Sequence, residues 1–342
     1  MASPRQIINK AWAWITGLVT AALLAGGITI GIPRDIGTRT PERVWSANNG
    51  SQVTGMIGSK DGLFVNITYS FSRSGYNSEI WRSTDGRGFA RVWSGPVETV
   101  GQGMVVGDEI HWPVEHGDKG SGGRSLVWKD GRVQGGPKIA APWSITSGEG
   151  YIPYNDGYTG GRRGFNNDKA RWVNVASGKV DFRSEVPGFV RSIFRHMGSL
   201  AYTVNYADPK LVVGGKAYPT RMLKAGSRGN QIFGGGGVDG AGGGNDGGIY
   251  LWEGGKEKEI GRVGGQSCEA IYADDNRVLL GFINPDEIVE ITRKGEPRVI
   301  ASIPGDRRYT GGWAFGAAIA KWDGKWWWAR SDNSRVHVYR MD

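Results

Sequence analysis

The sequence of 342 residues contains only one cysteine, Cys268. An internal disulfide is therefore excluded, and packing alone has to stabilise the fold. We expect Cys268 to be a small, buried apolar residue. Apolar residues are also slightly scarce, at 39%, whereas glycine (58) and tryptophan (15) are abundant. This balance favours short strands and tight turns over helices, so the composition predicts an all-β fold.

Acidic residues are the scarcer charged group, with 33 of them against 42 lysines and arginines, which gives a net charge of +9. The basic residues are scattered singly and form no long run. Such a diffuse excess favours anionic partners such as cell-envelope polymers or anionic lipid, without specifying one. The sequence carries no motif that recognises bases, so nucleic acid is disfavoured as a partner.

Long apolar runs are missing except near the N-terminus, where residues 11–32 carry no charge. Ser3, Pro4 and Gln6 suit the start of a helix. At a rise of about 1.5 Å per residue, a helix over the whole run could cross a bilayer core. The pair Gly26-Gly27 predicts an earlier stop, which would make the helix short for a span.

Small residues recur every four positions within this run and form a ridge along one face of the predicted helix. They are Ala13, Gly17, Ala21 and Ala25. Such a ridge lets helices approach closely, which predicts a homo-oligomer. Three interpretations stay open for residues 1–32: a membrane anchor, a helix buried among copies or partners in a large assembly, and a cleaved signal peptide. Residues 33–41, with two prolines, are expected to be an extended linker.

One tetrapeptide occurs twice, as Arg43-Val44-Trp45-Ser46 and as residues 91–94. The second copy follows strand-like sequence and the turn at Asp85-Gly86, whereas the first copy has no local partner. We expect the first copy to pair with the alternating segment 334–340 at the far end of the chain. That pairing would close a ring of sheets and remove the open edge.

Glycine-containing turns precede a basic and apolar strand in most units of the chain. These turns are Asp85-Gly86, Asp130-Gly131, Ser177-Gly178, Gly214-Gly215, Gly254-Gly255 and Lys294-Gly295. Their spacing of roughly 37 to 47 residues is the period of four-stranded propeller blades. With the last unit, they predict a seven-bladed β-propeller over residues 42–342, its last blade completed by residues 42–46. The alternative is a pair of packed β-sandwiches.

The segment from Ser83 to Phe89 resembles the Asp-box (BNR-like) turn of sialidase-like and other propellers. In such a turn the aspartate, here Asp85, accepts backbone N–H groups and the aromatic residue packs between strands. The resemblance implies a fold and not an activity. A sialidase would further need a Phe/Tyr-Arg-Ile-Pro segment, which residues 32–34 do not provide. A glycoside hydrolase stays as an alternative that requires two facing carboxylates.

Two segments of the sequence contain residue types that are found at metal sites. Residues 111–118 bring together two histidines and two acids, and the favoured interpretation is a polar loop. Residues 234–248 are glycine-rich and come near a calcium-binding repeat, but the repeat occurs once and the expected role is a loop where another chain can approach. The sequence therefore predicts no metal and no cofactor.

Aromatic clusters are the remaining functional signal. The candidate ligand-contacting residues are Tyr151, Tyr154, Tyr158, Trp326 and Trp328. Exposed aromatic residues suit carbohydrate or protein ligands, whereas packing between blades is the alternative role.

Together these features predict a non-enzymatic module that displays a propeller from a larger particle. The architecture resembles bacteriophage tail-tip or spike proteins, which implies a virion location, contacts with a host surface carbohydrate or protein, and neighbouring virion subunits. The alternatives are an envelope scaffold anchored in a bacterial membrane, with the propeller outside the cytoplasm, and a sialidase-like hydrolase.

Overall fold

A computed structural model describes residues 34–48, 50–72, 75–97, 99–115, 124–138, 146–154, 169–205, 208–237, 247–263, 267–283, 286–303, 316–332 and 335–341. The residues from Ile32 to Asp342 form one compact unit. The predicted assembly residues Ala13, Gly17, Ala21 and Ala25 lie outside the described residues, as does Tyr158. The described part of the chain contains no helix with the length and apolar character needed to cross a bilayer.

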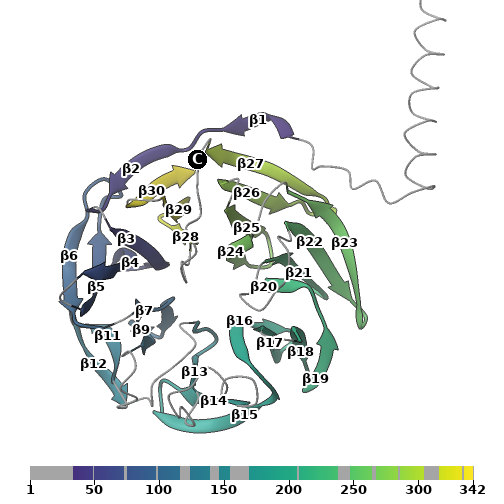
Figure 1. Cartoon of the computed structure of the whole chain (residues 1–342), viewed down its shortest axis with the longest axis horizontal. Coiled ribbons are helices and arrows are strands. Elements are labelled where there is room, and N and C mark those ends of the chain that lie inside the picture. Colours follow the sequence, from purple (N-terminus) through teal and green to yellow (C-terminus); the bar gives the residue numbers. More distant parts are fainter. Residues whose placement is uncertain are drawn as a thin grey trace, which may run out of the picture. The chain divides into compact units, whose positions relative to one another are not determined.

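The described strands form seven sheets of three to five strands that follow one another around a ring (Figure 1). Blade one contains β3 (Ser51–Ser59), β4 (Gly62–Ser72), β5 (Gly75–Ser83) and β6 (Ala90–Gly95). Blade two contains β8 (Met104–Val106), β9 (Glu109–Trp112), β11 (Arg124–Lys129) and β12 (Arg132–Lys138). Blade three contains β13 (Tyr151–Tyr154), β14 (Lys169–Asn174) and β15 (Lys179–Pro187). A short pair, β7 (Thr99–Val100) and β10 (Val114–Glu115), lies beside the second blade.

Blades four to seven have the same antiparallel order. Blade four contains β16 (Phe189–His196), β17 (Ser199–Asn205), β18 (Lys210–Val213) and β19 (Lys216–Pro219), and blade five contains β20 (Met222–Arg228), β21 (Gln231–Gly236), β22 (Gly248–Glu253) and β23 (Lys256–Arg262). Blade six contains β24 (Ser267–Ala273), β25 (Val278–Ile283), β26 (Asp286–Ile291) and β27 (Pro297–Ile303). Blade seven contains β28 (Ala317–Trp322), β29 (Lys325–Ser331), β30 (Val336–Met341) and β2 (Glu42–Ser46). The predicted seven-bladed propeller is confirmed.

Each of the six predicted glycine turns joins the last two strands that the chain contributes in sequence to one of the first six blades, for example β14 and β15 in blade three. Gly131 shows why glycine is needed there, because its φ of 77° is in the left-handed region that side chains with a Cβ avoid. The turn at Asp85 has the expected local hydrogen bonds. Its Oδ1 accepts the backbone N–H groups of Arg87 and Gly88 at 2.8 and 3.0 Å.

The two ends of the chain meet in blade seven. Strand β2 pairs antiparallel with β30, so that Trp45 lies opposite Val338 and Ser46 opposite His337. The ring closure predicted from the repeated tetrapeptide is confirmed. Both copies of that tetrapeptide occupy the outermost strand of a blade, β2 in blade seven and β6 in blade one. The same tetrapeptide therefore occurs at the same structural position in two neighbouring blades.

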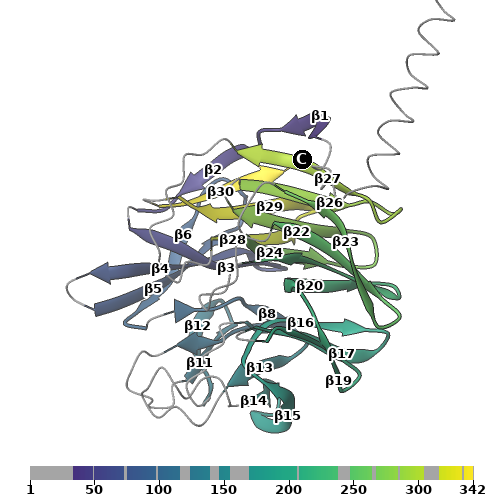
Figure 2. The ribbon, with the colours of Figure 1, turned by 45° about the vertical axis from the view of Figure 1, so that its right-hand side comes forward.

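The predicted linker contains a strand, β1 (Arg34–Arg39), which pairs parallel with β27 at the outer edge of blade six. Figures 1 and 2 both show β1 and β2 running one after the other along the outside of two neighbouring blades. Two consecutive strands near the N-terminus are therefore paired with two different blades.

Apolar faces of neighbouring blades pack against each other and form the core. The largest fully buried side chains include five tryptophans, namely Trp112, Trp128, Trp172, Trp327 and Trp328. Cys268 is fully buried, as expected, and burial raises the pKa of its thiol. Much of the tryptophan content is thus used for packing between blades.

Candidate functional site

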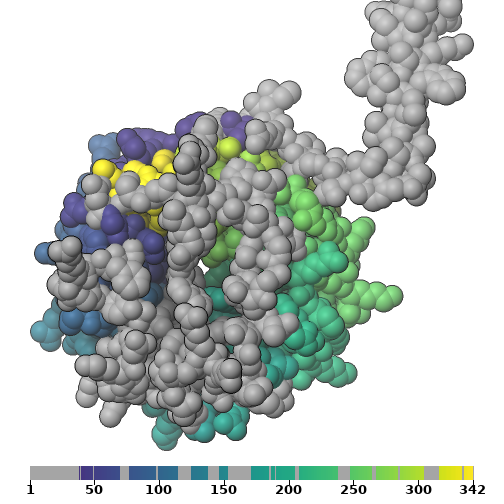
Figure 3. All heavy atoms as spheres, in the orientation of Figure 1, coloured from purple at the N-terminus to yellow at the C-terminus, as the bar shows by residue number. Residues whose placement is uncertain are grey.

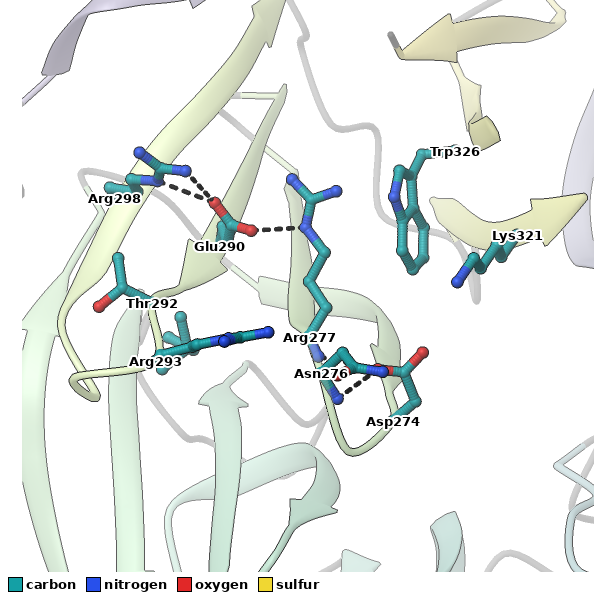
Figure 4. Close-up of a pocket in the computed structure, with 10 residues that line it drawn as sticks. Asp274, Asn276, Arg277, Glu290, Thr292, Arg293, Arg298, Lys321 and Trp326 are labelled. Carbon is teal, nitrogen blue, oxygen red and sulfur yellow. Dashed lines mark hydrogen bonds and ion pairs between the residues drawn. The ribbon is translucent and has the colours of Figure 1, made fainter. Parts of the chain in front are cut away.

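A cavity of about 480 Å³ lies between blades six and seven, which is a typical size for a small-ligand site. The turn after β24, the ends of β26 and β27 and the turn between β28 and β29 surround it (Figure 4). Its lining residues are Asp274, Asn276, Arg277, Glu290, Ile291, Thr292, Arg293, Arg298, Lys321 and Trp326. We call it the rim pocket.

Positive charge dominates the rim pocket. Among the described lining residues, four are lysine or arginine and two are acidic, which gives these residues a net charge of +2. The Glu290 carboxylate is largely buried, with 11% of its side chain exposed. It accepts hydrogen bonds from Nε and Nη2 of Arg298 at 2.8 and 2.6 Å and also from Nε of Arg277. Glu290 therefore holds two guanidinium groups in place.

Trp326 supports two cations of the rim pocket. The guanidinium of Arg277 lies 5.1 Å from the centroid of its ring and Nζ of Lys321 lies 5.4 Å from it. Figure 4 shows these two side chains on different sides of the ring. The ring of Tyr272 packs edge-on against the ring of Trp326, with 4.6 Å between the two ring centroids. Because a cation is attracted to the face of an indole, Trp326 orients Arg277 and Lys321 by cation–π contacts.

The turn that carries Arg277 is fixed by Asp274. Its Oδ1 accepts the backbone N–H groups of Asn276 and Arg277 at 2.9 and 2.8 Å, while Tyr272 donates its hydroxyl to Oδ2 at 3.2 Å. Burial and the neighbouring carboxylate raise the pKa of Tyr272 to about 12, so the phenol keeps its proton. Both acids of the rim pocket thus have structural hydrogen bonds.

The wall formed by the end of β26 is held by blade five. Nη1 and Nη2 of Arg228 donate to the carbonyls of Ile291 and Thr292, both at 2.8 Å. Burial lowers the pKa of Arg228. These contacts hold the carbonyls just before Arg293, so the backbone leading to that side chain is fixed.

The structure separates the predicted aromatic ligand residues. Trp326 lies in the rim pocket, but Trp328 is 0% exposed and packs against Tyr339 at 5.8 Å, so its role is blade packing and not ligand contact. Tyr151 belongs to blade three, where it packs on Phe182 at 5.4 Å and donates its hydroxyl to Asp181 at 3.2 Å. Tyr154 ends β13 in the same blade.

A second cavity of about 120 Å³ lies on the ring axis, where the first strands of the blades converge. Figure 3 shows the ring in the orientation of Figure 1, with the blades following one another around it in the order of the sequence. The charged lining residues described there are Arg191, Lys224 and Glu269. Nζ of Lys224 donates to the carbonyl of Arg191 at 3.0 Å, and burial lowers the pKa of Lys224 to about 8. Among the described lining residues, Glu269 is the one carboxylate.

Three side chains at the ring closure are connected by hydrogen bonds. Ser46 Oγ lies 2.7 Å from Nδ1 of His337, and Nε2 of His337 lies 2.7 Å from Oδ2 of Asp332. His337 is 6% exposed. The residues are those of a nucleophile, base and acid, but the network joins β2 to β30, and we interpret it as part of the closure. We call it the closure network.

The metal candidates gain no support from the described residues. No group of three or more histidine, cysteine or acidic side chains comes together in the part of the chain that the structure covers. His111 is buried and contacts Glu109 at 3.2 Å. His116, Asp118 and residues 238–246 of the glycine-rich segment lie outside the described residues.

Sequence reasoning found Trp326 but missed the charged residues around it. Arg277 lies in the turn between β24 and β25, Arg293 in the turn between β26 and β27, and Lys321 near the end of β28, and none belongs to a long basic run. The one available signal was the overall basic charge. The closure network was missed because its serine and its histidine are at opposite ends of the chain.

No family model matches this sequence, and no curated protein matches it. Solved structures do match its fold. The chain is a seven-bladed β-propeller. The streptogramin B lyase structure matches with a TM-score of 0.56 and 14% identity, over 88% of this chain and 97% of that chain. The Pan2 WD40 domain of Neurospora crassa matches with a TM-score of 0.56 and 8% identity, over 91% and 98%. A chain of the mitotic checkpoint complex matches with a TM-score of 0.56 and 12% identity, over 92% and 96%.

The fold of the propeller is shared by these structures, and identities this low establish the fold alone. One of the three is a lyase and another belongs to a protein complex, so function has to be argued from the sites of this chain.

Proposed function

We propose that this propeller is a non-enzymatic binding and display module, held to a larger assembly by the residues that precede β1. The setting we propose is a bacteriophage virion, as a tail-tip or spike component that contacts a host surface or neighbouring subunits. In this role the ring is a rigid platform, and its rim presents the groups that bind.

The observation that carries the proposal is the double attachment of the N-terminal strands. β1 pairs with β27 of blade six, and β2 pairs with β30 of blade seven. A force applied through the residues that precede β1 therefore has to detach β1 from blade six before it acts on β2 in blade seven. Two attachments in series suit a domain that is tethered through its N-terminal side.

The chemistry of the rim pocket supports binding over catalysis. Its two carboxylates, Asp274 and Glu290, already accept hydrogen bonds from a backbone turn and from two guanidinium groups. A glycoside hydrolase requires one carboxyl group as an acid and a second as a base or nucleophile, both facing the substrate. In the rim pocket, Glu290 instead holds two arginine side chains in position, so that the pocket presents positive charge in a fixed arrangement.

The assembly role predicts that the small-residue ridge makes the oligomer. In the full chain, Gly17→Ile combined with Ala21→Ile should dissociate the oligomer, because bulky side chains on the ridge prevent close approach of helices. The matched control is Ile15→Leu with Leu23→Ile, which keeps size and hydropathy and changes the face of the predicted helix opposite the ridge. Molar mass from light scattering in mild detergent measures the result.

Two outcomes would contradict this proposal. If the unaltered chain is a monomer both alone and with its particle, the display role is wrong. If both pairs of substitutions dissociate the oligomer equally, the ridge is not the contact. Incorporation into lipid vesicles without any self-association would favour the membrane-anchored envelope scaffold instead.

A further inference from the structure

We propose that the rim pocket binds an acidic glycan through one oxyanion group, a carboxylate or a phosphate carried on a sugar. This inference deepens the binding role proposed above and names its ligand class. The group that binds would lie between Arg277, Arg293 and Lys321, which line the same cavity from two turns of blade six and from the end of β28 in blade seven.

Arg277, Arg298 and Lys321 of the rim pocket are held by neighbouring side chains before any ligand arrives. Glu290 and Trp326 fix Arg277 from two directions, and the ring of Trp326 also orients Lys321. Side-chain ordering is a large part of the cost of binding, at about 0.5–1.5 kcal/mol for each immobilised long side chain. A pocket whose cations are already ordered can bind a small anion without that loss.

Two cations keep positive charge available for a ligand. Arg293 and Lys321 are both exposed, and among the described residues no carboxylate lies within ion-pair distance of either. Arg277, in contrast, is paired with Glu290. The available charge therefore sits on the two sides of the rim pocket.

The balance of groups fits a ligand that places a single anionic group, a carboxylate or a phosphate, in the cavity. The described lining residues have a net charge of +2 and include two acids, which suits one oxyanion, whereas the acids would repel a polyphosphate. The amide of Asn276 and the hydroxyl of Thr292 also line the cavity and can form hydrogen bonds with sugar hydroxyls. A volume of about 480 Å³ accommodates one or two sugar rings.

Nucleic acid fits the same observations less well. A duplex or single strand presents evenly spaced phosphates and needs a track of cations, often with stacking aromatic faces. Here the cations converge on one cavity, and the faces of Trp326 are already used by Arg277 and Lys321. A single oxyanion site in an open pocket is the better description.

Calorimetric titration of the full chain tests the inference. The probes are an oligogalacturonate, a neutral oligosaccharide of equal length, a sugar monophosphate, inorganic phosphate and a single-stranded oligonucleotide of matched charge. We expect binding of the oligogalacturonate or the sugar monophosphate, weaker binding of inorganic phosphate and none of the neutral sugar. Arg293→Gln and Lys321→Gln should each weaken the affinity about tenfold, the usual effect of losing one charged hydrogen bond.

The chain offers a neighbouring control for each variant. Lys294→Gln and Lys325→Gln remove one positive charge from the same turns but from residues outside the lining, and we expect changes below about twofold. The inference is overturned if lining and control variants weaken binding equally, if no acidic sugar binds, or if the oligonucleotide binds best through the same residues. Because this titration does not depend on Gly17 or Ala21, its failure is separable from failure of the assembly role.

Discussion

At the scale of single residues, position along a strand decides exposure as much as the face does. Trp326 and Trp328 point to the same face of β29, yet Trp326 is half-buried in the rim pocket and Trp328 is 0% exposed. Trp326 lies beside the turn to β28, whereas Trp328 lies two residues deeper. Alternation in the sequence predicts the face correctly, but it does not predict the depth.

Trp328→Ala should destabilise the full chain by about 3–5 kcal/mol, because it removes a large buried side chain and leaves a cavity. Trp326→Ala should cost less than half as much, since its ring is partly exposed and faces two cations in place of a close-packed apolar core. Urea unfolding followed by circular dichroism measures both. Equal losses would mean that Trp326 is a core residue and that the rim pocket is a packing feature.

At the scale of strands, the closure network makes the pairing of β2 with β30 depend on pH, because it contains a histidine. Burial lowers the pKa of His337, with the nearby Arg330 and Arg43 acting in the same direction and Asp332 opposing them. His337 is therefore neutral near pH 7. Neutral His337 donates Nε2–H to Asp332 and accepts the hydroxyl of Ser46 at Nδ1.

The sign of the pH effect follows from this lowered pKa. Below about pH 6.5 the unfolded chain takes up a proton at residue 337 that the folded chain does not. The free energy of unfolding should thus fall as pH decreases from 6.5 through the folded pKa, by at most about 1.4 kcal/mol per pH unit for this residue. In His337→Gln the slope should be smaller, while His111 and His196, whose pKa values burial also lowers, keep part of it. Urea unfolding between pH 5 and 7.5 measures the slope, and an unchanged slope in the variant would contradict the assignment.

Strands and turns were largely predictable from this sequence, and the sites were not. A glycine turn such as Asp130-Gly131 has a local cause, namely a backbone angle that few residues adopt, so it is visible in the sequence. β1 was not predicted as a strand because it adds to a finished blade and needs no alternating pattern. The rim pocket was not predicted because its cations are brought together only by the ring.

At the scale of the whole molecule, the seventh blade makes the two ends of the chain depend on each other. One apolar cluster contains Val53 and Met56 from blade one together with Trp327 and Val338 from blade seven, and Trp45 of β2 packs against it. The ring centroid of Trp45 also lies 4.9 Å from that of Phe89 and 5.2 Å from that of Trp81 in blade one. β2 therefore completes a blade and covers the boundary between the last blade and the first.

Comparing two truncated chains tests the closure. The chain 34–342 keeps β1 and β2, whereas the chain 47–342 leaves β30 as an open edge and removes Trp45 from its aromatic neighbours. We expect the shorter chain to melt at least 5 °C lower, because each lost kcal/mol lowers the melting temperature by about 2 °C in a domain of this size and several are lost. It should also aggregate, since an unpaired edge strand is a template for other chains. A synthetic peptide of residues 34–48 should restore much of the melting temperature when added to 47–342. Identical melting of the two chains, with no effect of the peptide, would show that the ring holds without its N-terminal strand.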